Sequence, residues 1–402
     1  MKAVHLPRGV WALGFVSLFM DLSSEMTQSV LPLLIVGSFG ASVAVLGLIE
    51  GIAESTAAFT KLLSGAVSDR FGRRKPLALL GYGLSAVVKP LFPLAGGVAA
   101  VTVARFLDRV GKGIRGAPRD ALVADLTPRE HHGAAFGLRQ SLDSVGAVLG
   151  PTVAFALMTW WLADVELVLW LAVVPAFLCV ATLAFYVREP EVRATPQQRP
   201  GVFADFHWRR FPKSFWWFVA TIALFTLMRI SEGFLVLRTQ DAGLSLASAP
   251  LALVAMNVAY VLCAYPAGRL SDRMPRARLL VLGCLVMAIA DLLLAFGESW
   301  LPIFAGIVLW GVHMGLTEGI VAALTADHAP VELRATAFGV VNVVRAIAVF
   351  AASALAGVLW AGYGAAATFC AAAAAAIATA AAISLLDRAS PHRTSALPDR
   401  RA

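Results

Sequence analysis

The sequence predicts an all-α membrane protein with twelve transmembrane helices in two pseudo-symmetric six-helix bundles. Hydrophobic residues make up 59% of the 402 residues and charged residues only 14%, whereas a soluble domain carries about 25% charged residues. Apolar runs of about 20 residues, the length that crosses a bilayer, recur along the chain. The two halves of the chain also share repeated sequence patterns.

The apolar runs are expected to be helices, because lipid admits only helices or closed barrels and these runs are too long for barrel strands. The first run is interpreted as a retained helix, since Asp21 and Glu25 follow it without a small-residue cleavage site. Short loops make consecutive helices antiparallel neighbours. The predicted spans are 9–35, 43–65, 77–95, 98–117, 135–159, 165–187, 214–238, 247–267, 278–297, 301–325, 336–359 and 364–386.

One long polar break divides the spans into two sets of six. Residues 188–213 are rich in Pro, Arg and Gln, which predicts a cytoplasmic linker with little fixed structure. We therefore expect an N-terminal bundle over 1–187, a C-terminal bundle over 214–388 and a cytoplasmic tail over 389–402.

The two halves repeat each other in sequence. The stretch Gly65-Ala66-Val67-Ser68-Asp69-Arg70 recurs as Gly268-Arg269-Leu270-Ser271-Asp272-Arg273, and Ala135-Phe136-Gly137 recurs as Ala337-Phe338-Gly339. Parallel six-helix repeats are typical of one large class of transporter, in which the substrate site lies between the halves near the middle of the membrane.

The distribution of basic residues predicts the orientation. Most of the 33 Lys and Arg residues lie in short clusters on one side of the predicted membrane, and the loops 36–42, 96–97 and 360–363 contain none. Because basic loops stay in the cytoplasm, we expect both termini there and place the chain in the bacterial inner membrane. The net charge of +8 is then a topology signal, not a sign of nucleic-acid binding.

A charged loop joins the second and third spans and has the pattern Gly65-x-x-x-Asp69-Arg70-x-Gly72-Arg73-Arg74-Lys75. Gly65 permits close helix approach, and Asp69 is placed to meet a helix N-terminus or an arginine. Two interpretations are open: a latch between the halves, or a topology signal alone. The repeat of the acid at Asp272 favours the latch, since topology does not require an acid.

This loop resembles the signature motif of the major facilitator superfamily. Two further patterns resemble motifs of that family: Arg109-x-x-Lys112-Gly113-x-x-Gly116, with Lys where the family has Gln, and Gly146-x-x-x-Gly150-Pro151, which is associated with its antiporters but lacks the later glycines here. The resemblance covers the whole chain. It implies alternating access, with a cytoplasmic gate formed by Gly65, Asp69, Arg70, Gly72, Arg73, Asp272 and Arg273.

Shorter patterns resemble one branch of that superfamily. Asp21-Leu-Ser-Ser-Glu25-Met26, Arg105-Phe-Leu-Asp108-Arg109 and Pro118-Arg119-Asp120 look like bacterial and archaeal permeases described as efflux proteins. The resemblance gives the fold and leaves the substrate open.

Ionisable residues inside the spans are the candidate functional groups, because a charge at mid-bilayer must face a cavity or a partner. The predicted proton-coupling and substrate residues are Asp21, Glu25, Glu50, Glu54, Arg105, Asp108, Arg109, Lys112, Arg139, Asp143, Glu232, His313 and Glu318. A carboxylate that moves between a wet and a dry site changes its proton affinity, and Arg109 is placed to exchange with it.

Structural explanations stand beside these functional ones. Arg139 with Asp143, and Arg105 with Asp108, could be satisfied ion pairs, and His313 could be a packing residue. We have no explanation for Lys89 in the third span.

The expected function is proton-coupled transport of a small solute or ion, with efflux of a drug-like, cationic or metal substrate by antiport. The alternative is an uptake symporter for a small organic anion. An enzyme is not expected, because the sequence contains no nucleophile elbow, HExxH or phosphate loop. We expect a monomer in the lipid bilayer, with no catalytic residues, cofactor, bound metal site or nucleic-acid partner.

Overall fold

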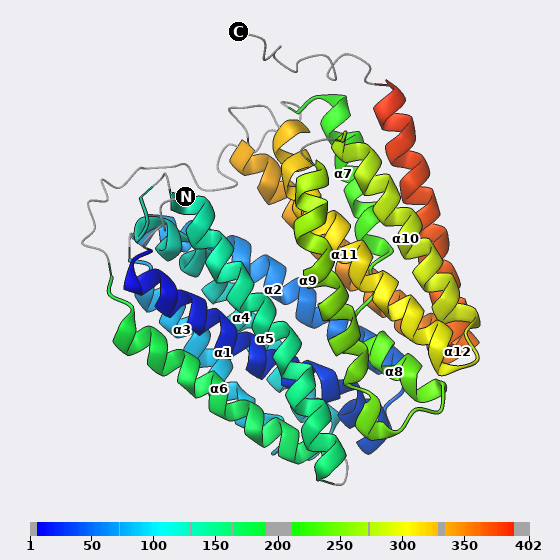
Figure 1. Cartoon of the computed structure of the whole chain (residues 1–402), viewed down its shortest axis with the longest axis horizontal. Helices are drawn as coiled ribbons and strands as arrows, with labels where there is room; N and C mark the ends of the chain where they lie inside the picture. The colour runs from blue at the N-terminus through cyan, green and yellow to red at the C-terminus, as the bar shows by residue number, and fades with distance from the viewer. Residues whose placement is uncertain are drawn as a thin grey trace.

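The computed structural model describes residues 6–71, 73–128, 131–161, 164–189, 211–271, 274–328 and 334–389. All regular elements within these ranges are helices, which confirms the predicted all-α fold. Figure 1 shows α1–α6 as one bundle and α7–α12 as a second bundle beside it.

The N-terminal half contains one helix for each predicted span. The first helix runs through Pro32 into a π-helical turn, and the third ends in a 3₁₀ turn at Lys89–Leu91. Asp164 caps the sixth helix by accepting a hydrogen bond from the Leu167 amide at 3.1 Å. The helices are α1 (Arg8–Pro32), α2 (Val43–Phe71), α3 (Lys75–Val88), α4 (Val98–Asp125), α5 (His132–Trp160) and α6 (Val165–Tyr186).

The C-terminal half differs from the prediction at one place. The predicted span 214–238 is broken into α7 and α8, so residues 228–232 leave the helix. Spans 336–359 and 364–386 form two helices, as predicted; both carry the label α12, and they meet at Gly364, where φ is 84°, a conformation that favours glycine. The helices are α7 (Lys213–Leu227), α8 (Gly233–Asp241), α9 (Leu251–Ser271), α10 (Arg276–Phe296), α11 (Trp300–His328) and α12 (Arg334–Ala389).

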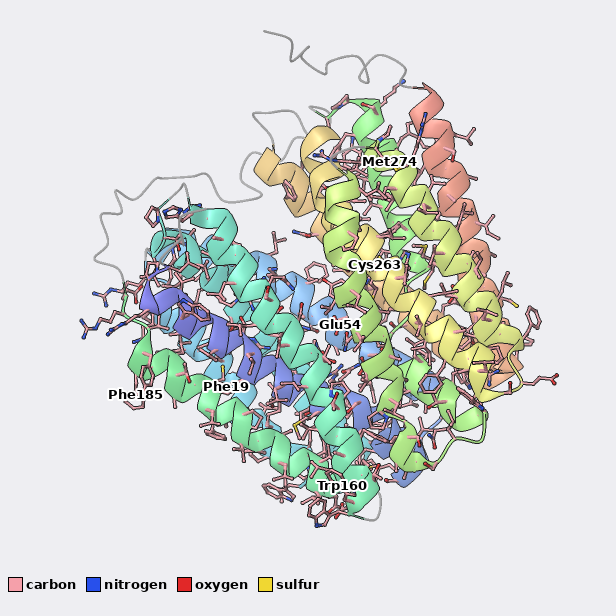
Figure 2. The ribbon with its side chains drawn as sticks, in the orientation of Figure 1. Phe19, Glu54, Trp160, Phe185, Cys263 and Met274 are labelled. Carbon is pink, nitrogen blue, oxygen red and sulfur yellow. The ribbon has the colours of Figure 1, made fainter. Side chains whose placement is uncertain are left out.

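Seven segments among the described residues are long and apolar enough to cross a membrane by themselves, and the segment Ala337–Leu385 is long enough for two crossings. Other predicted spans do not qualify alone because they are broken, as at α7 and α8, or rich in charge, as at α4. Large apolar side chains cover the outer surface. Phe185 and Trp160 project from the periphery in Figure 2, as expected where lipid is the solvent.

The two halves contact each other closely along α2 and α12. A Cβ atom added to Gly47 would overlap the Ser353 carbonyl oxygen, and one added to Gly51 would lie 2.9 Å from the Phe350 carbonyl oxygen. The Ser55 hydroxyl donates to the Ala346 carbonyl at 2.8 Å. We call this region, α2 residues 43–55 with α12 residues 346–357, the closed end.

The opposite end of the molecule carries the α2–α3 connection, and we call it the motif end. The bundles diverge toward it in Figure 1. Gly65 packs near Ala117 of α4, Arg73 is exposed, and Arg74 pairs with Asp125 at 2.6 Å. The latch remains a prediction, because the side chains of Asp69 and Arg70, and all of Gly72, Asp272 and Arg273, lie outside the described residues.

Most of the predicted linker 188–213 and of the tail 389–402 also lies outside the described residues. The last described residue before the linker, Glu189, accepts hydrogen bonds from the backbone amides of Arg74 and Lys75 at 2.6 and 3.2 Å. The Lys75 ammonium donates to the Ala184 carbonyl at 2.8 Å. The C-terminal end of α6 is thus fixed to the start of α3.

Enlarging Gly47 should open the closed end. Gly47→Leu overpacks the α2–α12 contact, at a cost of about 1–3 kcal/mol, and this favours states in which the contact is broken by roughly 5–150-fold. The measurement is the labelling rate of a single cysteine at Val349, in a cysteine-free background, by an impermeant maleimide added at the closed-end side.

The matched control is Gly83→Leu, because a Cβ at Gly83 has no neighbour within 4 Å. It should label at the unsubstituted rate. Equal rates for both leucine variants would show that the glycine contact does not hold the closed end.

Candidate functional site

A cavity of about 280 Å³ lies between the two halves. Glu54, a lining residue, lies between the bundles in Figure 2. From the N-terminal half the cavity is lined by Glu25, Gln28, Glu50, Glu54, Arg109 and Lys112. From the C-terminal half it is lined by Thr226, Arg229, Ile230, Ser231, Glu232, Trp310, Glu318, Arg345, Val349 and Ser353.

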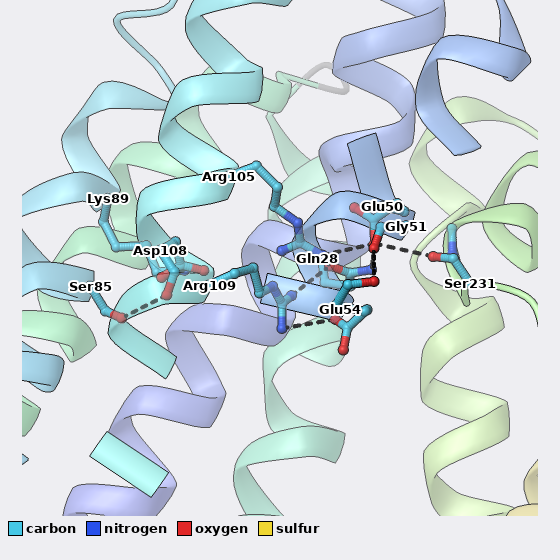
Figure 3. Close-up of polar contacts among 12 residues, drawn as sticks. Gln28, Glu50, Gly51, Glu54, Ser85, Lys89, Arg105, Asp108, Arg109 and Ser231 are labelled. Carbon is cyan, nitrogen blue, oxygen red and sulfur yellow. Dashed lines mark hydrogen bonds and ion pairs between the residues drawn. The ribbon is translucent and has the colours of Figure 1, made fainter. Parts of the chain in front are cut away.

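A dry ion pair lies at this cavity, between α4 and α2 (Figure 3). The Arg105 guanidinium donates to Glu50 Oε2 at 2.9 Å and also to Gln28 Oε1. The Gln28 amide donates to the same Glu50 oxygen at 3.3 Å. Arg105 and Glu50 are each only 1% exposed, so neither charge is stabilised by water. The three side chains therefore depend on one another.

Glu50 also connects the two halves. The Ser231 hydroxyl, in the break between α7 and α8, donates to Glu50 Oε2 at 3.1 Å. The Gly233 amide donates to the Ser231 oxygen at 3.2 Å, which fixes the hydroxyl in the unwound segment. The seventh predicted span is broken at this point, and the unwound segment thus presents the Ser231 hydroxyl to the other half. In an intact helix the backbone polar groups would bond to one another within the helix.

The second arginine of α4 forms a wetter pair. Arg109 Nη1 lies 3.1 Å from Glu54 Oε1, and its Nη2 donates to Gln28 Oε1 at 3.3 Å. The Glu54 side chain is 37% exposed. Arg109 is therefore shared between the buried Gln28 and a carboxylate that reaches the solvent.

Asp108 faces away from these groups, toward α3. The Lys89 ammonium lies 3.6 Å from Asp108 Oδ1, and both side chains are buried. The alternative in which Asp108 pairs with Arg105 does not occur here, because each has its partner on another helix. Lys89, which the sequence left unexplained, compensates the Asp108 charge.

Two glycines of α5 pack against α1 beside its acidic residues. A Cβ on Gly146 would lie 3.1 Å from the Asp21 Cβ, and one on Gly150 would lie 2.6 Å from the Glu25 Cβ. The Gly146-x-x-x-Gly150 pattern therefore lets α1 and α5 approach each other at the level of these two carboxylates.

A second cluster of charges joins α4 and α5. Arg139 pairs with Asp143 at 3.5 Å, one turn along α5, as the structural explanation predicted. Arg119 contacts Asp120 at 3.0 Å and Asp143 at 3.8 Å, and Asp21 lies beside Asp143. None of these residues lines the cavity, so Asp21, Arg139 and Asp143 are placed next to the site and not in its wall.

The C-terminal half contributes a second arginine–carboxylate pair. Arg229 Nη1, in the α7–α8 break, lies 2.6 Å from Glu318 Oε1 of α11, whose side chain is 38% exposed. Arg345 of α12 lies close to the same carboxylate. Glu232 is in the break as well, and it lines the same cavity as Glu25 and Glu54 of the other half, within electrostatic range of both and of Arg229.

His313 lies behind the cavity wall. It is fully buried, its Nδ1 lies 2.8 Å from the Gly283 carbonyl oxygen of α10, and its ring is beside Phe225 and Trp310. This position fits the packing explanation better than direct contact with a solute.

Sequence reasoning missed Ser231, Trp310 and Ser353 as cavity residues. An uncharged residue in an apolar run carries no signal of its own. The only sequence clue near Ser231 is the short polar run Arg229-Ile-Ser231-Glu232, which interrupts a span.

Two matched six-helix bundles that enclose a polar cavity at their interface define a secondary transporter of the alternating-access kind. The family model described as Major Facilitator Superfamily matches residues 13–256 and 218–402. The chain belongs to this superfamily, and it is a multi-pass membrane transporter, not an enzyme.

Relatives and solved structures agree with this assignment. The chain is 31% identical over 362 residues to an uncharacterised MFS-type transporter of Methanocaldococcus jannaschii, with 89% of each chain covered. It is 28% identical over 162 residues to the multidrug resistance protein MdtH of Yersinia pestis, covering 40% of this chain and 39% of the other. The crystal structure of a peptide transporter POT in complex with sulfate matches with a TM-score of 0.75, at 17% identity over 95% of each chain.

Removing Arg105 should destabilise the protein strongly. Arg105→Met leaves the Glu50 carboxylate buried without a cation, which costs about 3–5 kcal/mol. Adding Glu50→Gln should recover part of this loss, because neither member of the buried pair then carries a charge. The measurement is the thermal unfolding midpoint of the single and double variants in detergent.

The more exposed pair offers the matched comparison. Arg229→Met removes an arginine–carboxylate contact that is even shorter, at 2.6 Å against 2.9 Å, but water screens Glu318, so the loss should stay below about 1 kcal/mol. If Arg105→Met and Arg229→Met lower the midpoint equally, burial does not govern the strength of these pairs.

Proposed function

We propose that the chain is a proton-coupled exporter of the bacterial inner membrane, with Glu25 as the proton-carrying group. One observation supports this role above the others. Glu25 lines the cavity, yet its Oε2 is buried without a hydrogen-bond partner, and the carboxyl forms no ion pair among the described residues. By contrast, Glu50, Glu54 and Glu318 each have an arginine partner. Glu232 forms no ion pair among the described residues either, but its oxygens are not among the buried atoms that lack a hydrogen-bond partner.

The protonation state of a carboxyl in this position can change with the side of the membrane to which the cavity opens. Water stabilises the ionised form and a closed, dry cavity stabilises the protonated form. Arg109, Lys112 and Arg105 lie within electrostatic range of Glu25, so a shift of α4 against α1 would change the charge that the carboxyl senses. Proton uptake and release would then follow the movement of the halves.

The orientation and direction form part of this proposal. Arg73, Arg74, Lys75, Arg276 and Arg278 lie at the connections α2–α3 and α9–α10, which favours a cytoplasmic motif end and cytoplasmic termini. The conformation, tight at the closed end and divergent at the motif end, is then inward-facing. Two observations support export by antiport. The chain is similar to the multidrug resistance protein MdtH, and α1 packs closely against Gly146 and Gly150 of α5.

An uptake symporter for a small organic anion is the alternative. Lys112 and Arg345 line the cavity and, among the described residues, form no ion pair. Two cations that form no ion pair of their own would attract an anionic solute. In that case a proton gradient would drive accumulation of the anion in cells instead of depletion of a cation.

Glu25→Gln should abolish proton coupling while the protein remains folded, because the amide cannot carry a proton. Everted membrane vesicles are acidified by respiration, and internal pH is followed with a quenched dye while small cationic drugs or organic anions are added. In vesicles that contain the unsubstituted protein, a cation that is transported inward by antiport should exchange for internal protons and raise the internal pH. Vesicles with Glu25→Gln should respond like vesicles without the protein.

Glu166→Gln is the control, because this carboxylate lies in the first turn of α6, outside the cavity lining. It should behave as the unsubstituted protein does. Coupling that survives Glu25→Gln would remove Glu25 from the mechanism, and a response to anions alone would favour the symporter.

A further inference from the structure

The charges of the cavity are sorted into two groups, and the first is acidic. Glu25 of α1, Glu54 of α2 and Glu232 of the α7–α8 break lie within electrostatic range of one another. Two cations of α4, Arg109 and Lys112, lie beside them. We call these five residues the acidic pole. When all three carboxylates are ionised, which includes the deprotonated form of Glu25, they exceed the two cations by one unit of negative charge.

The second group is basic and belongs to the C-terminal half. Arg229 pairs with Glu318 at 2.6 Å, and Arg345 lies close to the same carboxylate without an ion pair of its own among the described residues. Two guanidinium groups thus share one carboxylate. We call these three residues the basic pole, which has one unit of excess positive charge.

The wall also contains apolar groups. Trp310, Ile230 and Val349 line the cavity, and the Trp310 indole N–H is buried without a hydrogen-bond partner in the part of the chain that the structure describes. The cavity volume of about 280 Å³ lies near the lower end of the range for small-molecule pockets, which fits a small solute.

We propose that the cavity takes a small zwitterionic solute, whose cationic group contacts the acidic pole and whose anionic group contacts Arg345 and Arg229. A simple cation would leave the excess positive charge of the basic pole unmatched, and a simple anion would do the same to the acidic pole. A dipolar solute matches both and brings no net charge into a low-dielectric site. The assignment rests on the proposed transport function and adds the substrate class.

The test compares probes that differ only in charge. Purified unsubstituted protein is titrated calorimetrically, without a proton gradient, with phenylalanine, its cationic amide and its anionic N-acetyl derivative. A second set consists of 4-aminobutyrate, its amide and its N-acetyl derivative. In at least one set the zwitterion should bind roughly tenfold or more tightly than either singly charged analogue, because it forms one more charge-assisted hydrogen bond.

Two variants assign the poles. Arg345→Gln should remove the preference for the zwitterion over the cationic amide, because it deletes the contact to the carboxylate. Glu232→Gln should remove the preference over the N-acetyl anion. Glu166→Gln, outside the cavity, should keep both preferences.

The proposal is overturned if a singly charged analogue binds as tightly as its zwitterion in both sets, if no probe binds, or if both preferences survive the two variants. These outcomes are separate from a failure of proton coupling. Glu25→Gln tests coupling with a gradient, whereas the titrations measure binding at equilibrium and vary Arg345 and Glu232.

Discussion

A charge inside the bilayer must face a partner or a cavity, and α4 shows how this requirement organises the N-terminal half. Arg105 pairs with Glu50, Arg109 with Glu54 and Asp108 with Lys89, so each of these three charges of α4 reaches a neighbouring helix. Because an unpaired buried charge costs several kcal/mol, these contacts fix the register of α2 and α3 against α4. This register also sets the positions of side chains in the cavity wall, since Glu50, Glu54 and Arg109 line it.

Close helix approach makes this pairing possible. A Cβ on Gly113 would lie 2.8 Å from the Ala57 carbonyl oxygen of α2, and one on Gly111 would lie 2.7 Å from the Gly81 carbonyl oxygen of α3. In lipid, helices associate through such backbone contacts because burial of apolar surface supplies little driving force. The same device at Gly146 and Gly150 holds the acids of α1 beside α5. Glycine placement and charge placement therefore act together at the site.

Within the part of the chain that the structure describes, the two halves meet through few polar bonds, which suits a protein whose halves move. Ser231 donates to Glu50, Ser55 to the Ala346 carbonyl and Asn257 to the Ala147 carbonyl. Opening the closed end must break the Ser55 bond and disturb the Ser231 bond, whereas the Arg105–Glu50 pair stays within its half. The strongest electrostatic contacts thus stabilise each bundle, and the weaker ones join the bundles.

The sequence alone determined the helical fold, the two-half organisation and the set of intramembrane charges, because hydropathy and repeats are local properties of the chain. It also identified Glu25, Glu50, Glu54, Arg109, Lys112, Glu232 and Glu318, all of which line the cavity. Only the tertiary structure decided which charges pair, since Lys89 and Asp108, or Arg229 and Glu318, are far apart in the chain and meet only after the helices pack. It alone revealed the break at residues 228–232 and the Ser231 contact, because Ser231 and Glu50 lie in different halves and meet only after the helices pack. It also placed His313 behind the wall.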